Sequence, residues 1–205
     1  MHNLSIPTNL TKEEKYRQLL PQLEAIVAGE TEVIANIANV TAALKEAFGW
    51  WWVGFYLVKE MGTGSGKQGD ETLTTHNPQL LTELVLGPFQ GPVACTRIAL
   101  GKGVCGTAWQ DAKTIIVPDI DLFPGHIACS GASKSEIVVP VFHPSLMGRG
   151  SVEVIAVLDV DSEFLNHFDE VDKEWLEQIC GLPFGVGHMK CLHSQTEKRS
   201  SNYKL

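Results

Sequence analysis

Three of the five cysteines in this 205-residue chain lie in one stretch that ends at an isolated acidic residue. Cys95, Cys105 and Cys129 precede Glu136, in segments with the composition of a globular core. A thiolate is a strong nucleophile, and a second thiol can trap its oxidised form as a disulfide. These residue types therefore predict redox chemistry at sulfur, provided that the fold brings the thiols and the carboxylate together.

Cys129 is the strongest candidate nucleophile among the three thiols. The turn-forming Pro124 and Gly125 precede it and the small residues 130–133 follow it, so a ligand has room to approach. Backbone N–H groups in such a turn favour the reactive thiolate. The alternative is a buried cysteine that packs as a small apolar side chain. A zinc site is a further alternative, although the close cysteine pair typical of structural zinc sites is missing; its ligands would be Cys95, Cys105, Cys129 and His126.

Two aspartates in a later strand-like segment could join the thiols. Asp159 and Asp161 flank Val160, and strand alternation points both carboxylates to one face. Like charges on one face repel unless a cation or a proton satisfies them. The pair therefore suits an ammonium group, or a carboxyl whose raised pKa makes it a proton donor. Glu136, at the rim of the apolar strand IVVPVF, is a third acidic candidate, and a solvated strand end is the alternative for the aspartate pair.

An aromatic run supplies the apolar part of the same hypothetical site. Trp52 and Tyr56 lie an even number of residues apart in a strand-like segment, so they share one face and can wall a pocket. A pocket with an aromatic wall, paired carboxylates and a thiol suits a small zwitterion with a soft apolar tail. A pocket that encloses both charged ends of an amino acid would exclude a peptide chain.

The hydrophobic pattern predicts an α+β domain with a central antiparallel sheet flanked by N-terminal and C-terminal helices. Helices are expected from Thr11 to Gly29, from Thr31 to Gly49, over Val104–Asp111, and after a capping Asp169 up to Gly181. A polar, glycine-rich loop is expected over residues 60–82. Strands are expected at Trp50–Val58, Thr82–Leu86, Val93–Ala99, Thr114–Val117, Ile137–Phe142 and Val152–Val160.

Composition limits the partners and the compartment. The net charge is −8, and no basic stripe interleaves with aromatic residues, which argues against nucleic acid and against an anionic membrane surface. The odd cysteine count and the lack of a secretory signal argue against a disulfide framework. We expect the reducing cytoplasm, with the nucleus as a second location, where a disulfide would be transient and mechanistic.

Six segments in fixed order resemble the free methionine-(R)-sulfoxide reductases, which are enzymes made of a single GAF domain. The segments are WVGFY at 52–56, LVLGPFQGPVAC at 84–95, GKGVCGTA at 101–108, FPGHIAC at 123–129, SEIVVP at 135–140 and VLDVDS at 157–162. The resemblance covers residues 11–180, which we predict to be the domain. It makes no functional prediction for the tail, residues 181–205.

The resemblance implies a mechanism and assigns the site residues. Cys129 would attack the sulfoxide sulfur and become a sulfenic acid, Cys95 would resolve it as a disulfide, and Cys105 would exchange with that disulfide. Thioredoxin would be the external reductant, and no bound cofactor is expected. The substrate would be held by Trp52, Tyr56, Glu136, Asp159 and Asp161. The remaining alternative is a GAF-type sensor that binds a small ligand without catalysis, and the choice between monomer and homodimer stays open.

Overall fold

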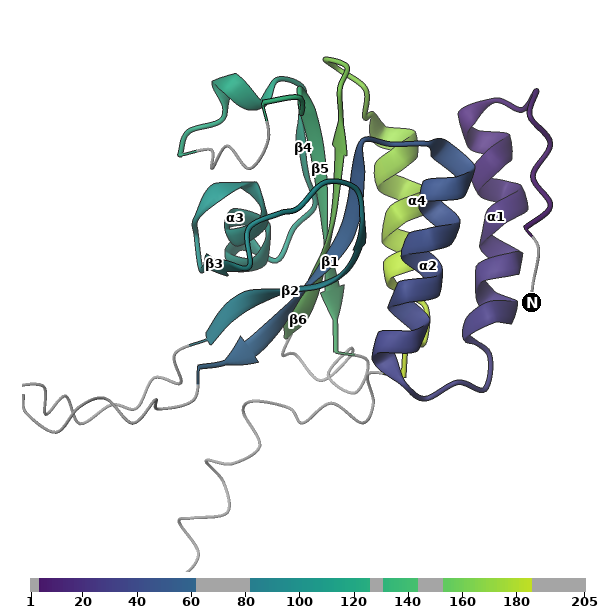
Figure 1. Ribbon diagram of the computed structural model, residues 1–205, viewed down its shortest axis with the longest axis horizontal. Coiled ribbons are helices and arrows are strands. Elements are labelled where there is room, and N and C mark those ends of the chain that lie inside the picture. Colours follow the sequence, from purple (N-terminus) through teal and green to yellow (C-terminus); the bar gives the residue numbers. More distant parts are fainter. Residues whose placement is uncertain (1–3, 62–81, 126–130, 144–152, 186–205) are drawn as a thin grey trace, which may run out of the picture.

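The computed structural model describes residues 4–61, 82–125, 131–143 and 153–185, and these ranges form an α+β fold around one antiparallel sheet (Figure 1). The helices are α1 (Lys12–Val27), α2 (Val33–Phe48), α3 (Gly103–Asp111) and α4 (Glu170–Cys180), with a short 3-10 helix at Ile120–Leu122. The strands are β1 (Trp52–Glu60), β2 (Thr82–Gln90), β3 (Arg97–Ala99), β4 (Ile115–Val117), β5 (Ser135–Phe142) and β6 (Val154–Ser162). The predicted fold class is confirmed.

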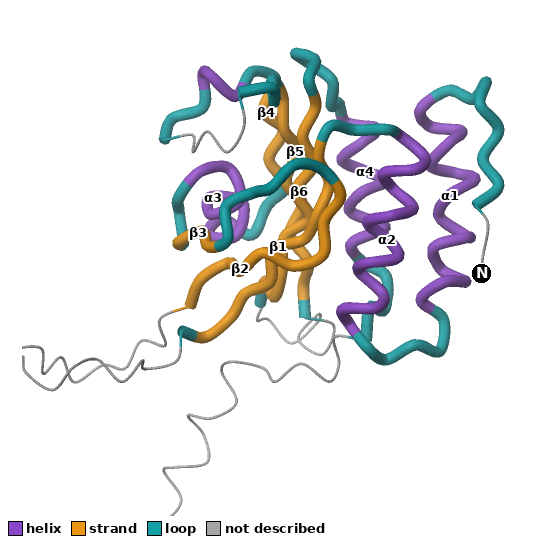
Figure 2. The backbone as a smooth tube through the Cα atoms, viewed as in Figure 1, coloured by secondary structure: helices purple, strands orange, loops and turns teal. Residues whose placement is uncertain are grey.

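The six strands lie in the order β3-β2-β1-β6-β5-β4, and every neighbouring pair is antiparallel. The last strand of the chain, β6, therefore occupies the centre of the sheet, between β1 and β5. Helices α2 and α4 pack directly on one face, and α1 packs on both of them (Figure 2). The core between these layers is apolar; its fully buried members include Leu19, Leu44, Phe55, Leu158 and Leu176.

Reciprocal caps fix where α1 and α4 begin. The Thr11 side chain accepts from the Glu14 N–H, and the Glu14 carboxylate accepts from the Thr11 N–H at 2.9 Å. Asp169 and Asp172 form the same arrangement at the start of α4. Each cap satisfies backbone N–H groups that a helix leaves unpaired in its first turn. Both caps confirm helix starts predicted from the sequence.

A buried ionic cluster joins α1 to α4. The Asp172 side chain is fully buried; its carboxylate accepts from the Tyr16 hydroxyl at 2.9 Å and from Lys12 Nζ at 2.5 Å. Lys12 also bonds Asp169 at 2.9 Å. We call Lys12, Tyr16, Asp169 and Asp172 the anchor cluster. Its members satisfy one another, so the cluster fixes the outer helix α1 against α4.

The opposite face of the sheet carries α3, which also contacts the edge strand β3 (Figure 1). Side chains of β1 alternate between the two faces: Phe55 packs toward the helix layer, whereas Trp52 and Tyr56 pack on the α3 side. α3 is a single short helix, and the pocket described below lies between its first turn and this face of the sheet.

Two predicted strands differ most from the structure, and the other four differ by one or two residues at their ends. β2 runs to Gln90 instead of Leu86 and passes through Pro88; β3 pairs only with residues 83–85, so the proline's missing N–H interrupts no ladder on that edge. Of the strand predicted at Val93–Ala99, only Arg97–Ala99 is a strand. The residues before it form an irregular turn that starts at Gly91, with a φ of 142° that side chains rarely adopt. The 3-10 helix at Ile120–Leu122 was not predicted.

The remaining sequence predictions concern segments that the structure covers only in part. The expected loop at 60–82 falls almost entirely outside the described residues, as does the tail after Gly185. The domain limits, 11–180, stay a prediction. No helix in the described ranges is both long and apolar enough to cross a membrane.

Candidate functional site

A small pocket of about 60 Å³ opens on the sheet face that carries α3. The sheet, the first turn of α3, the turn after β2 and the segment before β5 all contribute to its lining. Its aromatic lining residues are Trp51, Trp52 and Tyr56, and its hydroxyl, thiol and acidic residues are Ser133, Cys105, Glu136, Asp159 and Asp161.

Strand register brings residues from distant parts of the chain to this pocket. Trp52 of β1 pairs with Asp161 of β6, and Asp161 pairs with Glu136 of β5. The next row on the same face pairs Gly54 with Asp159. The predicted alternation that points Asp159 and Asp161 to one face is therefore correct, and it places them beside the aromatic strand.

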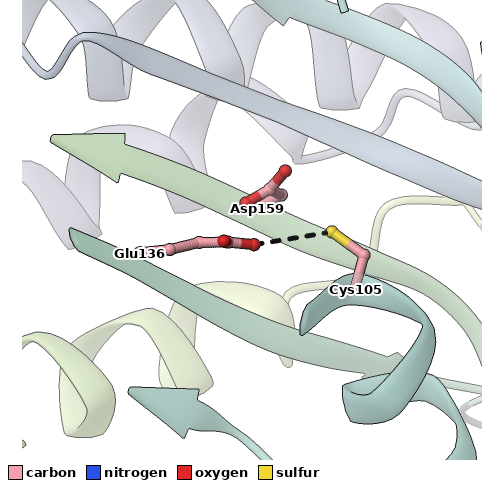
Figure 3. Close-up of side chains that lie close together, drawn as sticks. All are labelled: Cys105, Glu136 and Asp159. Atoms are coloured by element: carbon pink, nitrogen blue, oxygen red, sulfur yellow. Dashed lines mark hydrogen bonds between the residues drawn. The ribbon is translucent and has the colours of Figure 1, made fainter. Parts of the chain in front are cut away.

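Cys105, Glu136 and Asp159 point toward one another inside the pocket (Figure 3). The Cys105 thiol donates to Glu136 Oε1 over 3.9 Å. The Cys105 sulfur, one Glu136 carboxylate oxygen and one Asp159 carboxylate oxygen all lie within 4.8 Å of one another. Glu136 is 6% exposed and Asp159 is 7% exposed. Glu136 is the second residue of β5, near the end of the strand as expected, whereas the alternative of a solvated strand end does not fit the buried Asp159.

Burial makes these groups hold protons more tightly than usual. Burial, followed by the negative charge of neighbouring aspartates, raises the pKa of Glu136 well above its ordinary value. Burial and then Asp161 raise the pKa of Asp159 in the same way. Burial and then the charges of Asp159 and Glu136 raise the pKa of the Cys105 thiol. A bound cation could displace protons from these sites, because it would compensate the charge that burial disfavours.

Asp161 and Asp159 differ in how they are partnered. Burial raises the pKa of Asp161 to about 6, although the Ser133 hydroxyl stabilises its charge by donating to Oδ1 at 2.5 Å. Asp159 Oδ1 is buried, and among the described residues it has no hydrogen-bond partner. Such an atom costs about 1–3 kcal/mol. We call Cys105, Glu136, Asp159 and Asp161 the pocket cluster; its unsatisfied oxygen indicates a place for a ligand.

Stacked rings form the apolar wall. The Trp52 ring centroid lies 6.0 Å from that of Tyr56 and 5.5 Å from that of Phe89, with nearly parallel planes between Trp52 and Phe89. The indole passes over Gly54, where an added Cβ would come within 2.5 Å of it. Glycine at this position therefore provides the space in which Trp52 lies flat against the sheet.

The polar ends of the same aromatic residues hold the turn after β2. Trp52 Nε1–H donates to the Pro92 carbonyl at 3.1 Å, and the Tyr56 hydroxyl donates to the Cys95 carbonyl at 3.0 Å. Residues 92–94 of this turn line the pocket, and Cys95 follows them in a half-buried position. The wall thus fixes the backbone that carries Cys95 at the pocket's edge.

The first turn of α3 closes another side. Lys102, the N-cap, lines the pocket together with Gly103 and Val104, and its side chain makes no capping hydrogen bond. The N–H groups at a helix N-terminus carry partial positive charge and favour an anion. The pocket therefore combines acidic side chains with a positively polarised helix end.

Known proteins share both the sequence and this architecture. The chain matches the GAF domain family model over residues 32–182. It is 55% identical to GAF domain-containing protein A of Dictyostelium discoideum, covering 84% of this chain and 92% of that protein. It is 38% identical to the free methionine-R-sulfoxide reductase of Saccharomyces cerevisiae, covering 88% and 89%. The crystal structure of a Neisseria meningitidis free methionine-R-sulfoxide reductase in complex with its substrate matches with a TM-score of 0.72 and 47% identity, covering 88% and 92%.

The chain belongs to the free methionine-R-sulfoxide reductase family. The family resemblance and the single GAF domain predicted from the sequence are thereby confirmed. The structure gathers six of the predicted site residues around the pocket: Trp52, Tyr56, Cys105, Glu136, Asp159 and Asp161. Cys95 lies next to residues that line it, whereas Cys129 falls outside the described residues, as does His126 of the zinc alternative. The roles assigned to these residues stay predictions.

Sequence reasoning missed two features of this reductase-family pocket. Ser133 was noted only as a small residue, but it bonds Asp161. The sequence prediction includes Lys102 and Gly103 only within the segment 101–108, but they form the helix end that faces the pocket. The glycine before a short helical pattern was the available signal for that helix end. The Ser133 bond had no local signal, because it spans 28 residues of sequence.

A larger groove of about 920 Å³ lies elsewhere, between the end of α4, the α1–α2 turn and β5. Its lining includes Cys180, a buried thiol whose pKa burial raises. Cys180 has no cluster of acidic neighbours like that around Cys105 among the described residues. It therefore provides a matched control for the pocket thiol.

Proposed function

We propose that this protein reduces free L-methionine-(R)-sulfoxide to L-methionine. One observation carries the proposal: the pocket cluster lies between an aromatic wall and a helix N-terminus. These three surfaces complement the ammonium, the apolar tail and the carboxylate of one small zwitterion. The names of relatives that share more than a third of the sequence support the same substrate.

The proposed binding mode follows from the charges. Asp159 and Asp161 hold the substrate ammonium, which gives Asp159 Oδ1 a partner that none of the described residues provides. The substrate carboxylate binds the N–H groups at the start of α3, and Trp52 and Tyr56 contact the methyl end. Glu136, whose pKa burial raises, holds a proton near the sulfoxide oxygen. A peptide-bound methionine sulfoxide has neither free charge and would leave the acidic groups unpaired.

Cys129 is the proposed nucleophile. It is four residues from Ser133, which lines the pocket, so chain length alone keeps its Cα within about 14 Å of the Ser133 Cα. Its thiolate attacks the sulfoxide sulfur while a pocket carboxyl protonates the oxygen. This attack forms a bond between the Cys129 sulfur and the substrate sulfur, and the S–O bond of the substrate breaks. Transfer of the released hydroxyl to the Cys129 sulfur then breaks the new S–S bond, which leaves a sulfenic acid on Cys129 and methionine, whose sulfur has gained two electrons.

Cys95 is the proposed resolving residue. Its thiol attacks the Cys129 sulfenic acid, a disulfide forms and water leaves; Cys105 exchanges with this disulfide. A dithiol reductant of the thioredoxin class then returns both thiols, so no bound cofactor is needed. This cycle requires a reducing compartment, the cytoplasm or the nucleus.

The decisive experiment is thioredoxin-coupled turnover of the separated R and S sulfoxides of free methionine. We expect activity on the R form alone, loss of turnover in Cys129→Ser, and near wild-type turnover in Cys180→Ala. N-acetylmethionine sulfoxide methylamide, which carries neither charge, should be a poor substrate. Activity confined to the S form, or equal activity on the blocked substrate, would contradict the proposal.

The same assay separates catalysis from ligand sensing. A GAF-type sensor would bind a small ligand with the same affinity in Cys129→Ser and in the parent protein, and neither would turn over the sulfoxide. Sedimentation of the pure protein decides between monomer and homodimer.

A further inference from the structure

We propose that the thiol form of the protein binds one zinc ion in the pocket through Cys105, Glu136 and Asp159. Zinc and an amino-acid substrate would then exclude each other from the site. The metal site rests on the arrangement of these three residues alone. Only the competition rests on the proposed function.

The donor atoms are those that zinc prefers, at a spacing close to what zinc requires. Zn–S bonds are about 2.3 Å and Zn–O bonds about 2.0–2.2 Å, so tetrahedral ligand atoms stand roughly 3.6 Å apart. The Cys105 sulfur lies 3.9 Å from Glu136 Oε1, and all three donor atoms lie within 4.8 Å of one another. Small side-chain rotations therefore suffice to bring all three onto one ion (Figure 3).

The described residues of the cluster leave one buried carboxylate oxygen without a partner, and a cation would provide one. Asp159 is 7% exposed, and its Oδ1 has no hydrogen-bond partner among the described residues. Three acidic or thiol groups buried together repel as anions, and a dication would neutralise two of their charges. Asp161 is not among the three, because its carboxylate already bonds Ser133. The ion would keep one coordination position open toward the pocket.

This site differs from the thiol-rich zinc site that the sequence left as an alternative. That set contains Cys95, Cys105, Cys129 and His126, and it shares only Cys105 with the present one. A sulfur–oxygen–oxygen site predicts a single thiolate bond to the metal. A thiol-rich site predicts three.

Cobalt(II) reports the number and identity of thiolate ligands. The reduced, chelator-treated protein is titrated with cobalt(II), and near-ultraviolet thiolate-to-cobalt charge transfer is recorded; zinc is then measured by competition with a chromophoric chelator. We expect one equivalent of metal and a band of single-thiolate intensity. Cys105→Ser should abolish the band and weaken zinc at least about 100-fold, since even the loss of an outer partner costs 10–100-fold.

Matched variants separate this site from other thiols. The double variant Cys95→Ser/Cys129→Ser and the variant Cys180→Ala should both keep the band. Asp159→Asn, which preserves the size of the side chain, should weaken zinc binding. Asp161→Asn should retain the thiolate-to-cobalt band. Circular dichroism of each variant establishes that it is folded.

Three results would overturn the proposal: no stoichiometric metal in the wild-type protein, an unchanged band in folded Cys105→Ser, or loss of the band in Cys95→Ser/Cys129→Ser. These measurements need no turnover, so they stand even if the proposed substrate is wrong. If metal binds and the R sulfoxide of methionine does not compete with it, the proposed substrate mode fails and the metal site does not.

Discussion

The protein buries carboxylates in two places that differ in how they are partnered. In the anchor cluster, Asp172 accepts from Lys12 and from Tyr16. In the pocket cluster, Asp159 is surrounded by Glu136, Asp161 and the Cys105 thiol, and one of its oxygens has no partner among the described residues. Both aspartates are almost completely removed from solvent.

The difference separates structural from functional burial. A buried acid that meets a cation and a hydroxyl holds elements together, because removing any member exposes an unpaired charge. A buried acid that meets other acids reduces stability in the empty protein, and only a bound cation or proton relieves it. Burial alone therefore does not identify a functional carboxylate; the charge of its neighbours does.

The largest effect should come from the anchor cluster. Asp172→Ala leaves Lys12 without its buried partner and Tyr16 without its acceptor. We expect the free energy of unfolding to fall by about 3 kcal/mol. Turnover per folded molecule should stay unchanged. Urea titration measures the first quantity and active-site-normalised kinetics the second; a loss of turnover in folded protein would break the comparison.

Asp159→Asn should produce the opposite pattern. The change removes a buried acid whose Oδ1 has no partner among the described residues, so the free energy of unfolding should stay equal or rise. Binding of the substrate ammonium should weaken by about 2 kcal/mol, roughly thirty-fold, since a charged hydrogen bond is lost. Calorimetric titration of the sulfoxide into Cys129→Ser and Cys129→Ser/Asp159→Asn measures this. A marked fall in the free energy of unfolding of Asp159→Asn would show that Asp159 stabilises the fold, as Asp172 does in the anchor cluster.

The pH dependence of stability tests Asp161. Its pKa is raised from 3.8 to about 6 in the folded protein, so the folded state binds this proton more tightly than the unfolded chain. The contribution of Asp161 to stability is therefore fully present below about pH 4 and is lost as the pH rises toward 6. Between pH 4 and pH 7, the free energy of unfolding of Asp161→Asn should therefore fall by about 1.5 kcal/mol less than that of the parent protein. This difference is smaller than the full pKa shift would give, because Asp161 is partly exposed. Urea titrations of both proteins at pH 4 and pH 7 measure the difference; identical pH dependence would contradict it.

The smallest effect should come from an exposed pair. Lys173 bonds Glu170 at 3.1 Å on the surface of α4, where the Glu170 side chain is 81% exposed. Lys173→Ala should change the free energy of unfolding by about 0.3 kcal/mol and leave turnover unaltered. This variant gives the background for the other measurements. If the free energy of unfolding changed by more than about 1 kcal/mol, an exposed ion pair would stabilise the protein strongly as well. Burial would then not explain the large effect expected for the anchor cluster.

The sequence predicts those parts of the fold that depend on neighbouring residues. The Thr11–Glu14 and Asp169 caps depend on contacts three residues apart, and both helix starts are correct. The alternation that aligns Asp159 with Asp161 is equally local. By contrast, the passage of β2 through Pro88 depends on where β3 stops pairing, which no local pattern reveals.

The candidate site divides in the same way. Residue types identify Cys105, Glu136 and the aspartates as candidates, but the burial of Glu136 depends on α3 packing over β5. That Asp159 Oδ1 has no partner among the described residues depends on how side chains from several strands pack around it. Such properties arise from packing between distant segments, so only the folded structure reveals them.

The central position of β6 has a consequence for the folding of the newly made chain. β6 supplies both pocket aspartates and pairs with β1, joining Trp52 to Asp161 across half the length of the chain. Until residues 154–162 have left the ribosome, β1 and β5 have no strand between them. Such long-range closure is expected to be late and slow in folding. Cys105 is therefore synthesised well before the acidic groups that surround it, and a partly made chain carries its thiols without the pocket that restrains them.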